Sequence, residues 1–345
     1  MAHNTLYSFT MWLLILVAAA ACNGKKSPEA RQVLETGCYP HAVLYKGKYY
    51  YTMQENGSNK IVIYETTDLT KLSTARRKTV WQPADRRYHS DIWSPELHRI
   101  NNKWYIYFES DDGTNTDNHQ LYVIENSAND PMQGQYTLHG PIITNREWNF
   151  GIHPTTIVVK GQQYLLWSGW QHRRAETETQ CIYIARMANP WTLSTPRVLI
   201  SYPKYEWERQ WINPDGHRSA YPIYVNENPE AFFSKDGKRI IVCYSASGCW
   251  TIYSALGMLW ANADADLTNP ASWHKSKEPV FMLSQKDSLY GPSDISIVPS
   301  QDGKTTHLLY ETKHLNPGGV VTKSVRMQNM EWDKNGMPVF GQPVK

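Results

Sequence analysis

The sequence lacks several features that define common protein classes. Its 345 residues contain five cysteines, none of them in a CxxC pair, so a zinc site is not expected and any disulfide pairing stays open. Lysine and arginine total 35 against 32 acidic residues, and the arginine pairs are scattered along the chain. Because no basic stripe forms, nucleic acid is excluded as an expected partner. Helical periodicity is almost absent, so a helical core is excluded as well.

Long apolar runs are also missing, apart from one short run near the N-terminus. Residues 11–21 read MWLLILVAAAA, which is too short to span a bilayer, and Cys22 follows directly. Small residues before a cysteine resemble the bacterial lipobox, in which that cysteine is lipidated. We interpret residues 1–22 as an export signal with Cys22 as the lipidation site, and residues 23–36 as a linker. The mature protein is then a periplasmic or cell-surface lipoprotein of a bacterium, held at the membrane only by its lipid anchor; plain secretion is the alternative.

Aromatic residues are plentiful, and their kinds are unequal. The chain has 14 Trp and 22 Tyr but 7 Phe. Trp and Tyr combine a stacking face with a hydrogen-bonding edge, which suits sugars and also suits ordinary β-sheet cores.

One short pattern recurs along the chain. A tight polar or glycine turn precedes an aromatic and β-branched strand in KGKYYYT from residue 46, NNKWYIYFES from 101, KGQQYLLWSG from 160, DGKRIIVCYSA from 236 and DGKTTHLLYET from 302. A short apolar strand lies upstream of each turn, so the pattern is a β-hairpin in five copies. Repeated hairpins that need further strands to cover their faces favour a radial repeat over a β-sandwich. We predict an all-β, five-bladed β-propeller over residues 37–345, in which the first strand of each blade lines a central channel.

Several segments, in order, resemble glycoside hydrolase family 43, most closely its α-L-arabinofuranosidase-type members. They include IWSPELHRINNKWYIYFESDDG, ANPWTLSTPRVLIS, NENPEAFF, YGPSD and VRMQNMEWDKNGMPVFGQPV. The resemblance implies hydrolysis of glycosidic bonds with inversion by carboxylates from three blades. One Asp before a Pro is the general base, a second Asp orients it and tunes its pKa, and a Glu is the general acid. Two such carboxyls must differ in protonation and stand far enough apart to admit a water.

Carried over position by position, the resemblance retains one of these three carboxylates. Glu227, in Asn226-Glu227-Asn228-Pro229, matches the acid; a structural hydrogen-bonding role is the alternative. The base position before Pro40 is Tyr39, and the orienting position before Pro154 is His153. Asp294 stands after Gly-Pro-Ser, where the family commonly has a His that helps to hold a central ion or water.

The replacements leave their own roles open. A phenol is a poor base at neutral pH, so we expect Tyr39 to bond substrate or fill space, with a nucleophilic tyrosine as the lesser alternative. His153 has a side chain suited to acid or base work, or is a satisfied polar residue. Asp294 is a relocated base, a structural group, or a ligand for a Ca²⁺ in the channel; no cofactor is otherwise expected.

A second set of residues is expected to hold substrate. The resemblance places Glu96 and Arg326 in the pocket, and His41 should point to the same side as Tyr39. Trp93, Trp148 and Trp170 are candidates for sugar stacking, with core burial as the alternative.

The first functional hypothesis is an exported, monomeric glycosidase that removes terminal sugars, arabinofuranosides by resemblance, from polysaccharide. Glu227 is its acid, and an unconventional partner comes from His153, Asp294 or the substrate. The second is a glycan-binding protein without turnover on the same scaffold, and a protein-interaction propeller is a weaker third.

Overall fold

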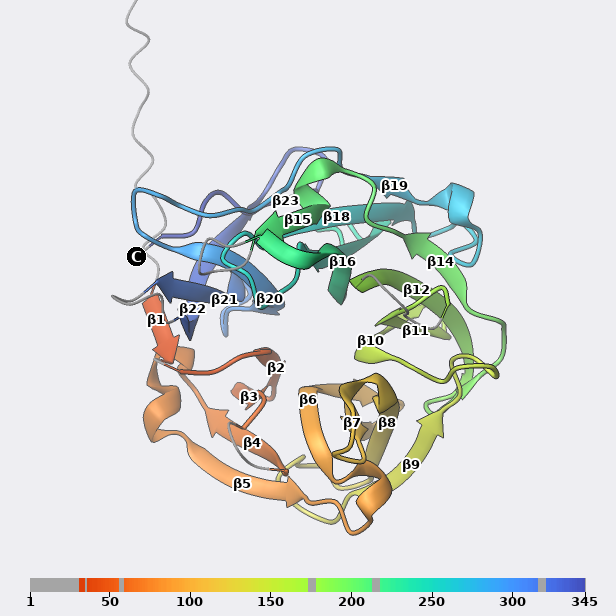
Figure 1. Cartoon of the computed structure of the whole chain (residues 1–345). Coiled ribbons are helices and arrows are strands. Elements are labelled where there is room, and N and C mark those ends of the chain that lie inside the picture. The colour runs from red at the N-terminus through yellow and green to blue at the C-terminus, as the bar shows by residue number, and fades with distance from the viewer. Residues whose placement is uncertain are drawn as a thin grey trace, which may run out of the picture.

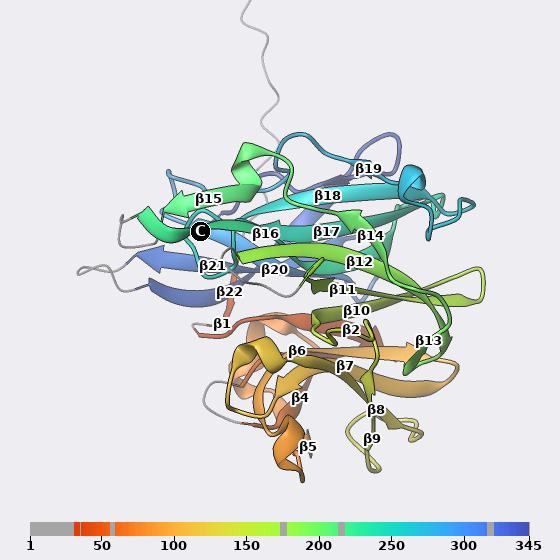
Figure 2. The ribbon, with the colours of Figure 1, turned by 45° about the vertical axis from the view of Figure 1, so that its right-hand side comes forward.

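The computed structural model describes residues 31–34, 36–55, 59–172, 178–212, 218–315 and 321–344. The export signal, Cys22 and most of the predicted linker lie outside these residues. Figure 1 shows the described strands grouped into five blades around a central axis, and Figure 2 shows the same disc turned toward its side. The all-β, five-bladed β-propeller predicted from the hairpins is confirmed.

Each blade is an antiparallel sheet whose first strand lies nearest the axis. Blade I is built from β2 (His41–Tyr45), β3 (Lys48–Thr52), β4 (Ile61–Thr66) and β5 (Arg76–Trp81). Blade II is built from β6 (Ser90–Ile100), β7 (Lys103–Asp111), β8 (Gln120–Asn126) and β9 (Thr137–Ile142). Blade III is built from β10 (Ile152–Val159), β11 (Gln162–Gly169) and β12 (Glu178–Asn189), with β13 (Thr192–Leu193) and β14 (Val198–Ser201) at its outer edge.

The last two blades follow the same plan. Blade IV is built from β16 (Arg218–Phe233), β17 (Arg239–Ala246), β18 (Ala255–Asn262) and β19 (His274–Lys275), with β15 (Arg209–Ile212) paired to β16. Blade V is built from β20 (Tyr290–Pro299), β21 (Thr306–Leu315), β22 (Val321–Trp332) and the N-terminal β1 (Arg31–Leu34), with β23 (Pro338–Val339) paired to β22. Short 3₁₀ turns connect strands: η1 (Leu69–Thr74), η2 (Arg86–Tyr88), η3 (Thr116–Asn118), η4 (Glu206–Glu208) and η5 (Pro270–Ser272). Within the described residues, no helix is long and apolar enough to cross a membrane.

Tight turns explain the predicted hairpins. Both central residues have positive φ at Lys46-Gly47, Asn101-Asn102 and Lys160-Gly161. Such two-residue turns match the right-handed twist of the strands that they join. Side chains then alternate between the two faces of each blade, and both faces must be covered.

The hydrophobic core lies between blades. Five clusters of buried side chains each join two neighbouring blades, for example Tyr50 and Ile63 of blade I with Trp104 and Phe108 of blade II. Blade V and blade I share such a cluster too, which closes the ring.

The strand β1 corrects the extent of the predicted linker. Residues 31–34 pair antiparallel with β22, near the other end of the chain, and Val33 packs against Leu309 and Val325 (Figure 1). An edge strand with unpaired backbone groups is a liability, and pairing it with β1 completes blade V. The segment looked like a linker because four residues are too few to show a strand pattern.

Candidate active site

Five residues around the channel share an unusual backbone conformation. Tyr39, Ser94, His153, Asn228 and Asp294 have φ of 54°, 36°, 53°, 51° and 48°, one in each blade, and each lies on its blade's first strand or just before it. The first four precede a proline, which normally pushes a residue toward extended backbone. Strand pairing shifts register next to four of these five residues. A bulge with positive φ turns a side chain out of the regular alternation, so every blade redirects one side chain by the same backbone conformation.

A cavity of about 300 Å³ lies at the end of the channel where the first strands begin. Trp93 of blade II, Phe150 and Trp170 of blade III, and Trp250 of blade IV supply its aromatic lining. Phe150 and Trp170 stack with ring centroids 3.7 Å apart, and Trp93 stacks on His119 at 4.1 Å. Polar lining comes from Tyr39, Thr116, Asp117, His153, Gln180, Glu227, Cys249 and Lys323. This combination of flat aromatic faces and few polar groups suits a sugar ring.

The predicted acid, Glu227, faces this cavity and is 1% exposed. Its Oε1 accepts a hydrogen bond from the backbone N–H of Cys249 at 2.5 Å. Its Oε2 lies 3.7 Å from Nε2 of His153. A carboxyl held in place in a nearly dry site is the arrangement that general acid catalysis needs.

His153 is the neighbour of Glu227 and does not stand across the cavity from it. The imidazole is 3% exposed, and burial, with smaller contributions from His119 and Lys323, holds its pKa well below its usual range. The ring is therefore neutral at working pH. Its other nitrogen, Nδ1, lies 3.6 Å from Glu109 Oε1.

Tyr39 occupies the base position, and its environment makes it a worse base than a free tyrosine. Burial first, and then the nearby Cys249 and Asp294, raise the pKa of the phenol well above its usual value. The hydroxyl lies 3.8 Å from Cys249 Sγ, and the ring centroid is 5.1 Å from that of His153. The Tyr39 phenol thus keeps its proton.

Asp294 lies beside Tyr39 in the channel, and both line a narrower cavity below the aromatic one. Its carboxyl is hydrogen-bonded by Asn228 Nδ2, by Ser245 Oγ at 3.4 Å and by Ser293 Oγ at 3.3 Å. Burial, helped by Glu311, raises its pKa well above the usual value. The Ca²⁺ expected at Asp294 stays a prediction, and these surroundings fit it poorly because the carboxyl is already bonded and Lys323 is near.

A buried ion cluster lies behind Tyr39. Glu311 lies 3.2 Å from Lys313 and 3.1 Å from Lys323, and both Glu311 and Lys313 are fully buried. Burial opposes ionisation, but the two lysines lower the pKa of Glu311. Lys323 Nζ lies 5.7 Å from the Tyr39 ring centroid and lines the aromatic cavity. Two cations share one anion here, so this wall of the cavity carries positive charge.

Comparisons with known proteins agree with this geometry. The sequence profile of glycosyl hydrolases family 43 matches residues 33–338. The chain belongs to this family. It is 36% identical over 304 residues to an extracellular exo-alpha-(1->5)-L-arabinofuranosidase of Streptomyces avermitilis, covering 86% of this chain but 60% of that protein. A protein of the same name from Streptomyces chartreusis is 33% identical, covering 84% of this chain and 82% of that protein.

A solved structure supports the same family 43 fold. The α-L-arabinofuranosidase from Lactobacillus brevis matches with a TM-score of 0.78 and 31% identity, covering 90% of this chain and 95% of that chain.

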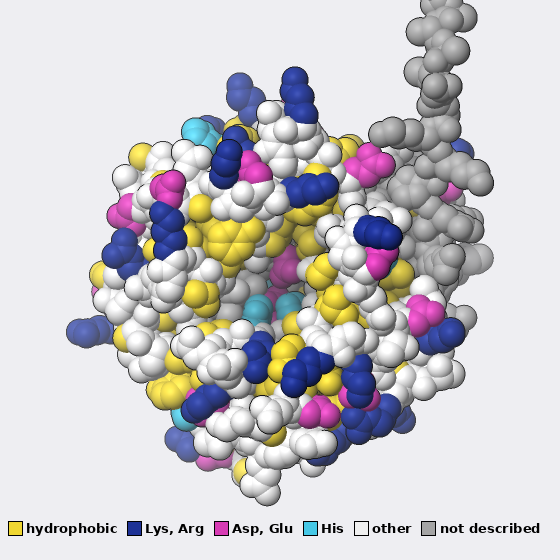
Figure 3. Space-filling view, turned by 180° about the vertical axis from the view of Figure 1, so that it is seen from behind, with side chains coloured by type: hydrophobic (Ala, Val, Ile, Leu, Met, Phe, Trp, Pro, Cys, Tyr) yellow, Lys and Arg dark blue, Asp and Glu magenta, His cyan; other side chains and the backbone are white. Residues whose placement is uncertain are grey.

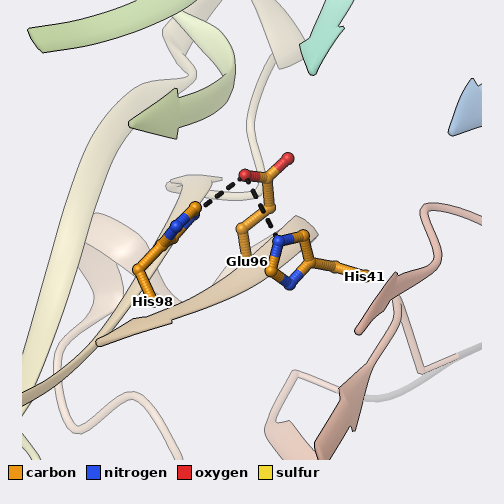
Figure 4. Close-up of side chains that lie close together, drawn as sticks. All are labelled: His41, Glu96 and His98. Carbon is orange, nitrogen blue, oxygen red and sulfur yellow. Dashed lines mark hydrogen bonds and ion pairs between the residues drawn. The ribbon is translucent and has the colours of Figure 1, made fainter. Parts of the chain in front are cut away.

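The two ends of the family 43 channel hold different chemistry. Seen from behind, the disc is hollowed at its centre, and imidazole and carboxylate side chains lie in that hollow (Figure 3). His41, Glu96 and His98 come together from β2 and β6, with one ligand-type atom of each within 4.8 Å of the others (Figure 4). His98 Nε2 lies 3.0 Å from Glu96 Oε2, and His41 Nε2 lies 4.0 Å from the same oxygen.

This cluster suits hydrogen bonds better than a metal ion. Burial holds the pKa of His41 well below its usual range, so its ring carries one proton. The backbone N–H of Leu97 donates to His41 Nδ1 at 3.3 Å, which leaves that proton on Nε2, facing Glu96. A metal ligand needs a lone pair at Nε2, so His41 is in the wrong tautomer. His41 and Glu96, which were both expected to bind substrate, line the narrower cavity and are not part of the lining of the aromatic one.

Only some of the remaining residues predicted to bind substrate line the aromatic cavity. Trp93 and Trp170 line the aromatic cavity, whereas Trp148 packs against the Phe150 and Trp170 pair from behind. Arg326 is 5% exposed and, among the described residues, is not part of the lining of the aromatic or the narrower cavity. Lys323, three positions earlier on β22, supplies the cation instead.

Sequence reasoning missed several residues of this site, among them Glu109, Cys249, Trp250 and Lys323. Glu109 left a signal, since it is a carboxylate in the strand KWYIYFESD, which is otherwise mostly apolar and buried. The other three lie in a loop or near a strand end, where no periodicity marks them.

Proposed function

We propose that this chain is an exported glycoside hydrolase that releases terminal arabinofuranosyl residues from polysaccharide, with Glu227 as general acid. The observation that carries the proposal is the buried Glu227 carboxyl at the floor of an aromatic cavity large enough for one sugar ring. The relatives named exo-arabinofuranosidases support the substrate, although the chain spans 60% of the S. avermitilis protein.

The base of this hydrolase is not Tyr39. Its phenol holds its proton. His153 is not the base either, because its Nε2 lies 3.7 Å from Glu227 Oε2, whereas the acid and the base of inverting enzymes stand about 6.5 to 9.5 Å apart to admit a water. Three sources of a base remain: the Asp294 carboxyl, the Asp117 carboxyl that lines the aromatic cavity, and a group of the substrate. An Asp294→Asn variant tests the first source, because its rate falls about a hundredfold only if Asp294 takes the proton.

A second candidate function is glycan binding without turnover. The observation that favours it is the same Tyr39, since a phenol with a raised pKa replaces the carboxylate that family members use to activate water. The aromatic lining serves binding equally well.

One experiment separates the two functions. Wild type and Glu227→Gln are incubated with a panel of aryl glycosides and arabino-oligosaccharides, and released sugar and binding heat are both measured. The hydrolase proposal expects arabinose from wild type and about a thousandfold less from the variant, with binding unchanged. Equal binding with no product from either protein would support the binding function instead.

Export rests on separate support. The apolar run at residues 11–21, the following Cys22 and two relatives named extracellular all agree with it. We propose lipidation at Cys22, to be tested by mass spectrometry of the mature protein and of a Cys22→Ser variant; the monomeric state stays a prediction.

A further inference from the structure

Three buried side chains form a row that leads away from the cavity. Glu227 of β16, His153 of β10 and Glu109 of β7 follow one another, with 3.7 Å from Glu227 Oε2 to His153 Nε2 and 3.6 Å from His153 Nδ1 to Glu109 Oε1. Their exposures are 1%, 3% and 0%. The imidazole therefore lies between two carboxyls that come from different blades.

Glu109 is held firmly at the inner end of this row. Ser94 Oγ lies 2.8 and 2.7 Å from its two carboxyl oxygens, so the hydroxyl donates to this group. The backbone N–H of His153 also donates to the carboxyl. Glu109 thus contacts both the backbone and the ring of a residue whose φ is 53°, and helps to maintain that strained conformation.

His153 Nδ1 is a buried nitrogen whose hydrogen bond is unsatisfied. This buried atom makes no hydrogen bond, and Glu109 is the carboxyl beside it. Leaving a buried polar atom without a partner destabilises the folded protein. A small approach of the two atoms, of the kind that accompanies substrate binding, would complete the bond.

We propose that Glu109 is a positioning residue of the site: it holds the proton of His153 on Nδ1, so that Nε2 presents its lone pair to Glu227. The family pattern expects a carboxylate at position 153, next to the acid. In this chain the carboxylate is Glu109, which lies on the far side of His153 from Glu227, and the imidazole transmits its effect.

The role of Glu109 follows from the position of each proton during the reaction, and it rests on the proposed hydrolase function. With Glu109 ionised and Nδ1 protonated, Nε2 accepts the hydrogen bond of a protonated Glu227, which keeps the acid ready. As the glycosidic C–O bond breaks, Glu227 gives its proton to the leaving oxygen and is later reprotonated by solvent. His153 and Glu109 neither gain nor lose a proton during catalytic turnover.

Other ionisable groups face this row and influence the pKa values of its members. They are Glu96, next to Glu109; His119 and Lys323, near His153; and Tyr39, Cys249 and Asp294, near Glu227. Burial raises the pKa of Glu109 to about 8, although the bonds from Ser94 and the His153 backbone oppose that rise. Ionising Glu109 therefore requires the additional bond to Nδ1–H.

The tautomer of His153 tests the proposal without any need for turnover. Nitrogen NMR of histidine-labelled protein distinguishes a protonated ring nitrogen from a bare one, and a His153→Gln variant assigns the signal. We expect the proton on Nδ1 in wild type and a shift toward Nε2 in Glu109→Met, which offers no acceptor. A proton on Nε2 in wild type would overturn the proposal, whether or not the variant folds.

The pH profile tests the consequence for catalysis. In Glu109→Gln, which keeps the size of the side chain, the basic limb of kcat/KM should move to lower pH by about one unit, because Glu227 loses the negative charge behind it. The matched control is Glu125→Gln in the adjacent strand β8, whose carboxylate pairs with Lys103 at 2.8 Å outside the row. An unmoved limb in a folded Glu109→Gln protein would refute the role. If wild type hydrolyses no substrate, the proposed function fails, and the NMR result alone decides the role of Glu109.

Discussion

The two walls of the aromatic cavity have diverged from the family pattern in different ways. On the wall from blades III and IV, the proposed acid Glu227 is present, and the Glu109 carboxyl stands behind His153 in place of a carboxyl beside Glu227. On the wall from blades I and V, Tyr39 stands at the position that the family resemblance assigns to the base, and a cationic cluster of Lys313, Glu311 and Lys323 lies behind it. The first wall preserves the chemistry of proton donation with new parts. The second wall offers a phenol that keeps its proton, and it carries positive charge.

The largest expected effect tests the cationic wall. Lys313→Met leaves the buried Glu311 with one cation and removes the ammonium that donates to Gly291 O at 2.7 Å and Ser293 Oγ at 3.0 Å. Breaking a buried pair typically costs about 3 to 5 kcal/mol, so we expect a loss of that order in the free energy of unfolding, measured with denaturant. The control Lys103→Met breaks a surface pair with Glu125 and should cost less than about 1 kcal/mol. Equal losses would mean that the cluster is not a structural element of this wall.

The second effect restores the missing base. Tyr39→Asp places a carboxylate near Lys323, and if the base limits turnover, arabinofuranoside hydrolysis should rise about a hundredfold. Tyr39→Asn has the same size without the charge and should show no rise. Both rates are measured with an aryl arabinofuranoside. No gain from the Asp variant would indicate that water activation already has another base.

A smaller effect concerns pH and the channel below both walls. Burial raises the pKa of Glu96 to about 8. The folded protein thus binds a proton that the unfolded chain releases near pH ~4.3, so this group's contribution to stability is complete below that pH and is lost as pH rises to about 8. Glu96→Gln should flatten the fall in melting temperature across this window, although screening weakens the effect because the side chain is 14% exposed. An unchanged slope would show that Glu96 is ionised in the folded state.

The smallest effect is expected at the Tyr39 hydroxyl. Tyr39→Phe removes a group whose nearest partner is Cys249 Sγ at 3.8 Å and should change kcat by less than about threefold. A loss of a hundredfold or more would instead assign the phenol a direct role in proton transfer or as a nucleophile.

The sequence predicted the blades and the identity of the residues around the channel better than their roles. Turn residues and strand alternation are local, so the five hairpins could be recognised, whereas β1 is too short and pairs with a strand almost 300 residues away. His153 was predicted as one possible partner of Glu227, and the structure brings the two side chains together. The link to Glu109 and the exchange of Arg326 for Lys323 depend on contacts across blades, which no single-strand pattern contains.

The pairing of β1 with β22 has a consequence for how this protein matures. Blade V takes its strands from residues 31–34 and 290–332, so the ring has no complete final blade until nearly the whole chain is available. Tyr39 follows β1 closely, and Lys323 lies on its partner β22, so the cavity wall that they form is assembled at this seam. A chain still in transit across a membrane would therefore have no finished cavity, and sugar binding would begin only after ring closure.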